Sequence, residues 1–108
     1  MTPEGRLVAY IKQRVKTLGG STRKCEWSNH AGAPDIFVML DGKHFWVELK
    51  KEGEHPRPIQ LREHKLMRNA GCEVYVLDSK EKINELLNLR KLFKTPIFER
   101  WGKHFCLN

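Results

Sequence analysis

The stretch GAPDIFVMLDGKHFWVELKK, residues 32–51, decides the fold. At its centre is Asp41-Gly42, the strongest short-range signal for a two-residue β-hairpin turn. The flanking segments, residues 35–40 and 43–50, are rich in β-branched and aromatic side chains, so we expect two antiparallel strands. Two acids, Asp35 and Glu48, interrupt these largely apolar runs, where a buried carboxylate is costly. Their presence indicates a partner or a function.

A two-residue turn fixes how the two strands pair. Leu40 then pairs with Lys43, and stepping down the ladder places Asp35 directly opposite Glu48. Opposed residues have Cβ atoms about 4.5–5.5 Å apart, so both carboxylates can bind one divalent cation. Lys50 lies on the same face and offsets only part of the repulsion between the acids. The register therefore predicts a site for Mg²⁺ or Mn²⁺.

Two acids and a lysine around a hard cation suit the hydrolysis of phosphodiesters. Such a cation prefers oxygen ligands, activates water and neutralises the charge that develops on phosphoryl oxygens. Lys50 is suited to orient the water or to stabilise the transition state. The alternative is that Asp35 merely begins a strand while Glu48 and Lys50 form an exposed ion pair. If only one of the two acids were present, this alternative would be the better interpretation. The two acids in matched register favour a metal site instead.

One helix and one strand are expected before the hairpin. Thr2-Pro3 is a helix-start signal, and apolar residues follow at helical spacing until Gly19-Gly20 ends the pattern. Residues 21–27 contain some β-formers with poor alternation and give a weaker prediction of a strand. Residues 29–34 read as a loop.

After the hairpin, the chain alternates helix, strand and helix. Residues 59–69 have helical periodicity, with Leu66 and Met67 expected to face inward. Residues 73–77 read as a short strand, and Ser79 can cap a helix that runs to about residue 89. The resulting order is α-β-β-β-α-β-α. We expect one domain over residues 1–108, with a terminal hairpin in the aromatic tail at 95–108.

Composition narrows the class of protein. The chain of 108 residues has 20 Lys and Arg against 13 Asp and Glu, a net charge of +7, which favours a polyanionic partner such as nucleic acid. A basic protein without such a partner is the alternative. Three widely spaced cysteines suggest no disulfide framework and fit a reducing, cytoplasmic setting. The first twenty residues suggest neither a signal peptide nor a membrane span.

Zinc is a further alternative to the proposed magnesium or manganese. Its candidate ligands are Cys25, His30, Cys72, His104 and Cys106. No ligand spacing supports them beyond one His-x-Cys near the end of the chain.

Pro34-Asp35, followed thirteen residues later by Glu48-Leu49-Lys50, resembles the PD-(D/E)xK nuclease signature. More narrowly, residues 32–35, 47–50 and 58–60, with Gly71, resemble the VRR-NUC family over roughly residues 2–79. This resemblance implies an α/β fold with a restriction-endonuclease-like αβββαβ core, a mixed sheet flanked by helices, and here an extra C-terminal helix.

The resemblance also assigns roles to residues. The implied metal ligands are Asp35, Glu48 and the backbone carbonyl of Leu49. The implied catalytic residues are Lys50, Gln60 and Glu4. Judged without the resemblance, Gln60 is a solvated residue of a first helical turn, and Glu4 is an acid favoured by the helix dipole. His64 lies one turn after Gln60 and could face the same cleft, although a lone histidine is usually a surface residue.

This chain resembles the short stand-alone members of the family, largely from phages and bacteria, which implies action in a bacterial or phage-infected cell. The resemblance to these members implies a homodimer that cuts branched DNA such as four-way (Holliday) junctions. A two-fold dimer would supply two active sites for the two strands. Candidate dimer surfaces are residues 86–93 and 97–105, with ordinary core packing as the alternative. Candidate phosphate contacts are Lys43, Lys51, Arg57, Arg62 and Lys65. The competing function is a nucleic-acid-binding protein that retains the fold without catalysis.

Overall fold

A four-stranded mixed sheet forms the centre of the computed structural model, which describes residues 1–92 and the side chains of residues 1–88. The elements are α1 (Pro3–Thr17), β1 (Ser21–Lys24), β2 (Ile36–Leu40), β3 (Lys43–Leu49), α2 (Pro58–Asn69), β4 (Val74–Leu77) and α3 (Lys80–Leu92). The predicted element order is confirmed. The expected terminal hairpin and the candidate dimer surface at 97–105 lie outside the described residues.

The strands follow one another across the sheet in the order β1-β2-β3-β4. The first three are antiparallel, and β4 runs parallel to β3 after the crossover through α2. The mixed sheet is therefore as predicted. β1 is shorter than the predicted 21–27, because the chain leaves the sheet after Lys24 and forms a long loop.

The hairpin has the predicted register. Leu40 pairs with Lys43 and the ladder continues to Ile36 opposite Val47. Asp41 and Gly42 both have positive φ, 53° and 75°, which is the backbone of a type I′ turn and matches the twist of the two strands. Alternation along both strands then sends one set of side chains to each face.

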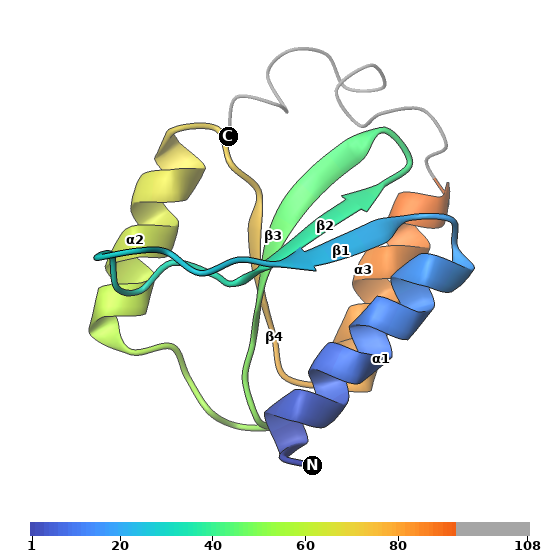
Figure 1. Ribbon diagram of the computed structural model, residues 1–108, viewed down its shortest axis with the longest axis horizontal. Coiled ribbons are helices and arrows are strands. Elements are labelled where there is room, and N and C mark those ends of the chain that lie inside the picture. The colour runs from blue at the N-terminus through green and yellow to red at the C-terminus, as the bar shows by residue number, and fades with distance from the viewer. Residues whose placement is uncertain (93–108) are drawn as a thin grey trace.

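The main core lies between the sheet and the helices α1 and α3, which cover one face, while α2 covers the other (Figure 1). The strands β2 and β3 contribute Ile36, Val38, Leu40, Phe45, Val47 and Leu49 to this core. The two helices contribute Leu7, Ile11, Val15, Ile83, Leu86 and Leu87. Leu86 and Leu87, part of the candidate dimer surface at 86–93, are therefore core residues. The helix α3 runs three residues beyond the predicted end.

One predicted orientation on α2 is wrong. Met67 is buried as expected, but Leu66 is 61% exposed. The buried side chains of α2 are Gln60, His64 and Met67, which lie at i, i+4 and i+7 on one face, so the adjacent Leu66 points to solvent. No helix among residues 1–92 is both long and apolar enough to cross a membrane.

Candidate active site

The two predicted acids lie across from each other on the face of the sheet that α2 covers. Asp35 directly precedes β2, and Glu48 is the sixth residue of β3. Because Ile36 pairs with Val47, the next pair along the same register is Asp35 and Glu48. The carbonyl of Asp35 accepts a hydrogen bond of 2.7 Å from the backbone N–H of Cys25, which holds Asp35 in line with the ladder.

The charges of several predicted residues act on the carboxyl group of Glu48. The Glu48 side chain is only 13% exposed. Burial first, and the nearby charge of Asp35 second, raise its pKa from 4.5 to about 7. The charge of Lys50 opposes this rise, Glu4 adds to it, and Arg57 opposes it. Asp35, Lys50 and Glu4 therefore all lie close enough to act on one carboxyl group.

Lys50 is held at the end of β3 where it leaves the sheet. Its backbone N–H donates to the carbonyl of Leu77 on β4 at 3.0 Å, and the residue as a whole is only 8% exposed. Leu49, between the two charged residues, turns its side chain into the core. This alternation leaves Glu48 and Lys50 on one face, as predicted from the sequence.

Glu4 reaches the site from the first turn of α1. The hydroxyl of Thr2 caps this helix by accepting the backbone N–H of Gly5 at 3.0 Å, so the predicted helix start is confirmed. The helix begins near the end of β3 (Figure 1), in agreement with the effect of Glu4 on the pKa of Glu48. Glu4 itself is exposed.

Gln60 is a buried residue of α2. It is 7% exposed, and its side-chain oxygen accepts the backbone N–H of Arg57 at 2.9 Å, which closes the first turn of the helix. The alternative of a solvated first-turn residue is therefore wrong. The loop before Asp35 packs directly on this turn: Gly32 has φ of 92°, and a Cβ there would lie 2.7 Å from the carbonyl oxygen of Ile59. The Gly-Ala-Pro segment thus brings β2 and α2 together.

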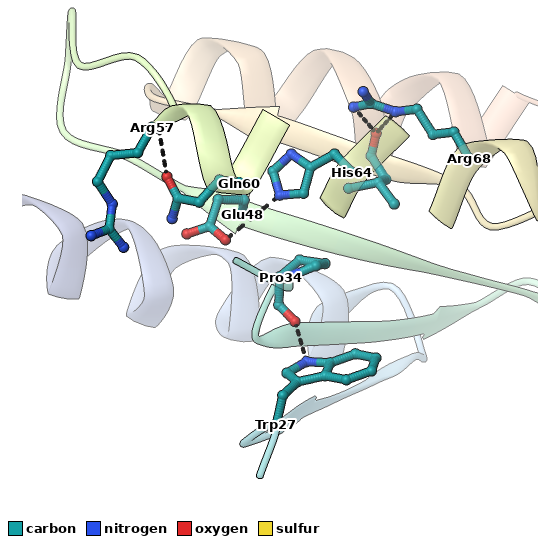
Figure 2. Close-up of polar contacts among 8 residues, drawn as sticks. Trp27, Pro34, Glu48, Arg57, Gln60, His64 and Arg68 are labelled. Carbon is teal, nitrogen blue, oxygen red and sulfur yellow. Dashed lines mark hydrogen bonds and ion pairs between the residues drawn. The ribbon is translucent and has the colours of Figure 1, made fainter. Parts of the chain in front are cut away.

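His64 lies one turn further along α2 and faces the same carboxylate (Figure 2). The ring is fully buried, with Nε2 4.0 Å from Oε1 of Glu48. Among the described residues neither ring nitrogen has a hydrogen-bond partner. Burial first, then the charges of Arg68 and Lys50, hold the pKa of His64 below its ordinary value, which favours the neutral ring. The spacing of His64 from Gln60, one helical turn, is the sequence signal that points to this position.

The five basic residues predicted to contact phosphates do not all gather at the site. Arg57 acts on Glu48 from the start of α2, and Lys51 is exposed immediately after Lys50. Arg62 and Lys65 are exposed on α2. Lys43 instead lies at the hairpin turn, five residues before Glu48, with its Nζ 3.9 Å from a carboxylate oxygen of Glu73.

The donor set fits a hard cation better than zinc. Within residues 1–92 no three His, Cys, Asp or Glu side chains converge on a common point, so Cys25, His30 and Cys72 give no zinc site there. His104 and Cys106 lie outside the described residues. Mg²⁺ commonly binds proteins through only one or two carboxylates and keeps several waters, which suits the pair formed by Asp35 and Glu48.

Comparison with known proteins identifies the family of this chain. No family model matches the chain. A protein of Acyrthosiphon pisum secondary endosymbiont phage 1, described as "Putative nuclease p44", is 38% identical over 79 residues, which cover 72% of this chain and 85% of the phage protein. A solved structure described as a VRR_NUC domain matches with a TM-score of 0.76 and 40% identity, and the match covers 82% of this chain and 97% of that one. The protein therefore belongs to the VRR-NUC family of nucleases.

Proposed function

We propose that this nuclease is a Mg²⁺- or Mn²⁺-dependent endonuclease that cuts branched DNA, such as four-way junctions, as a homodimer. The observation that carries the proposal is the register that sets Asp35 opposite Glu48, with Lys50 two residues further on. The charge of Asp35 helps to raise the pKa of Glu48, and two opposed carboxylates form an unfavourable arrangement unless a cation or a proton intervenes.

In this proposal Asp35, Glu48 and the backbone carbonyl of Leu49 hold the cation. A divalent cation bound there would supply Lewis-acid chemistry, polarising the phosphate and making water a better nucleophile. The ammonium group of Lys50 stabilises negative charge that develops on the phosphate oxygens. Gln60 keeps the first turn of α2 against the site, and the charge of Glu4 acts on Glu48 from the first turn of α1.

The basic charge of the chain and the symmetry of a junction support the proposed substrate and assembly. The net charge of +7 supplies attraction for the phosphate backbone without reading bases, which suits selection by DNA shape. Arg57, Lys51, Arg62 and Lys65 extend this charge from the site along α2. A two-fold dimer would supply two sites for two symmetric cuts at a junction. The phage relative supports action in the cytoplasm of a bacterium or a phage-infected cell.

The test is cleavage of flap, nicked, duplex and four-way-junction DNA with Mg²⁺, Mn²⁺ or EDTA. We expect cutting of branched DNA with either cation and none with EDTA. Lys50→Ala should lower the cutting rate by about 100-fold or more while junction binding persists. Lys12→Ala, at an exposed lysine of α1, is the matched control and should cut normally. Binding without cutting in every protein and metal would instead support the non-catalytic alternative.

Assembly is tested separately by light scattering and by mixed dimers. Wild-type and Lys50→Ala subunits combined in one dimer should nick one strand of a junction without resolving it. A monomer that makes both cuts would contradict the proposed homodimer.

A further inference from the structure

Aromatic rings form a continuous strip on the same face of the sheet as the two acids. The strip consists of Trp27, Phe37, His44 and Trp46. Phe37 pairs with Trp46 across β2 and β3, and their ring centroids are 4.8 Å apart. Trp27 lies 5.2 Å from Trp46, and His44 lies 5.5 Å from Phe37.

The strip begins beside the proposed catalytic residues. Phe37 is two residues after Asp35 and Trp46 is two residues before Glu48, so each ring is about 7 Å along its strand from an acid on the same face. The buried core lies on the opposite face and, among the described residues, includes none of these rings. Trp27 is 37% exposed, His44 is exposed, and Phe37 and Trp46 are half-buried. Four contiguous rings, two of them exposed and two half-buried, indicate a binding surface.

Trp27 is held in place rather than free to rotate. Its indole N–H donates to the carbonyl of Pro34 at 2.8 Å, so the ring is tied to the residue before Asp35 (Figure 2). The same loop is fastened to α2 by an ion pair of 2.9 Å between His30 and Glu63. A ring fixed in this way loses little conformational entropy when a ligand stacks on it.

Charge beside the strip indicates which ligand it takes. Arg23 on β1 pairs with Phe37, which places its exposed side chain on the same face as the rings. Rings bordered by a cation, next to a site for phosphodiester chemistry, match the chemistry of a nucleotide: a flat base and a phosphate. Bases within a duplex already stack on each other, so only an unpaired base can stack on a protein ring.

We propose that the strip formed by Trp27, Phe37, His44 and Trp46 stacks unpaired bases of the DNA strand next to the phosphate that is cut. This inference deepens the proposed function: among branched DNAs it favours substrates with unpaired nucleotides at the branch, such as flaps, over a fully paired four-way junction, and it rests on the proposed function for the position of the cut. Of the two tryptophans in the strip, Trp27 is the more exposed.

Binding in EDTA tests this inference without relying on catalysis. Wild-type protein should bind a fluorescent dT15 strand more tightly than a blunt duplex of the same length in low salt. Trp27→Leu, which keeps apolar bulk without a ring, should weaken binding to dT15 by about tenfold and leave duplex binding unchanged. Trp27→Phe should restore most of the affinity for dT15. Leu66→Ala, at an exposed apolar residue of α2, should match wild type.

Tryptophan fluorescence supplies a second measurement that leaves the strip intact. In Trp101→Phe the remaining tryptophans are Trp27 and Trp46. We expect dT15 to quench their emission and the duplex not to do so. This measurement decides the matter if Trp27→Leu fails to fold.

Several outcomes would overturn the inference. They are equal loss of dT15 and duplex binding in Trp27→Leu, binding of dT15 without quenching, and absence of dT15 binding. Conversion of a wild-type dimer to monomer by Trp27→Leu would show that a second copy of the chain covers the strip. If no DNA is cut but dT15 binding depends on Trp27, the proposed catalysis fails while the stacking surface stands.

Discussion

Replacing Glu48 with glutamine should stabilise the metal-free protein at alkaline pH. Burial and the charge of Asp35 raise the pKa of Glu48 from 4.5 to about 7. The folded protein therefore binds this proton more tightly than the unfolded chain does. Between pH 4.5 and 7 the unfolded chain has lost the proton while the folded protein keeps it, so the free energy of unfolding falls as pH rises. Above about pH 7 the folded protein has also lost the proton, and the free energy of unfolding falls no further from this group.

The size of the effect follows from the same two values. The interval from 4.5 to about 7, at 1.36 kcal/mol per pH unit, corresponds to about 3 kcal/mol. Glu48→Gln has nearly the same shape and no charge, so it avoids this penalty. We expect the variant to exceed wild type in unfolding free energy by up to about 3 kcal/mol at pH 8, and by less than about 1 kcal/mol at pH 5.

Urea unfolding at pH 5, 6.5 and 8 in EDTA, followed by circular dichroism, measures this difference. Glu85→Gln, at an exposed glutamate of α3, is the matched control and should show little dependence on pH. Added Mg²⁺ at pH 8 should stabilise wild type more than Glu48→Gln, because a ligand stabilises the state that binds it. A variant that is no more stable than wild type at pH 8, or whose advantage does not grow with pH, would refute the reasoning.

Three further predictions concern the same face. Gly32→Ala should lower the free energy of unfolding by about 2 kcal/mol or more, since its Cβ would meet the carbonyl oxygen of Ile59. The control is Gly53→Ala, at a glycine that also has positive φ but nothing within 4 Å of the added Cβ. Thermal melting should show a smaller loss of stability for this control. His64→Leu should preserve or raise the melting temperature, because it removes two buried nitrogens without hydrogen-bond partners among the described residues. Leucine also fills the space beside Glu48 without a charge, so cutting should persist, and a large loss of cutting would contradict the role of His64 as an uncharged filler. Mg²⁺ affinity measured by calorimetry should fall about tenfold per pH unit below pH 7, as protons compete for Glu48, and a flat profile would contradict the raised pKa.

The hairpin was predictable because two independent local signals agree on it. Asp41-Gly42 fixes the turn, and the alternation on both sides fixes which residues face the core, so the pairing down to Ile36 opposite Val47 follows from the sequence. The same register places Asp35 opposite Glu48, and the hydrogen bond from Cys25 adds to it.

Features that depend on distant contacts were not predictable in this way. The inward face of α2 depends on where β3 and the loop before Asp35 lie. Hydrophobicity alone therefore predicts Leu66 inward, whereas in the structure Leu66 is exposed and the side chain of His64 is buried. The charge of a lysine does not indicate which end of its strand it occupies relative to the site. Lys43 lies at the hairpin turn, at the opposite end of β3 from Glu48. Nor does any local pattern place Trp27 against Trp46, since the loop that carries it is shaped by contacts with Pro34 and α2.

The burial of Glu48 has two opposite consequences. Without a cation, the helix α2 removes water from a carboxylate that already faces Asp35, and the charged form is destabilised. The same loss of water strengthens the attraction between that carboxylate and a divalent cation, because the local dielectric constant is lower than in solvent. Lys50 offsets only part of the negative charge, which leaves room for a cation rather than replacing it. The buried ring of His64 lies beside Glu48 and excludes water from it. Its lowered pKa disfavours a positive charge that would compete with the cation. A site built in this way trades stability of the metal-free protein for affinity toward the cation that the proposed reaction requires.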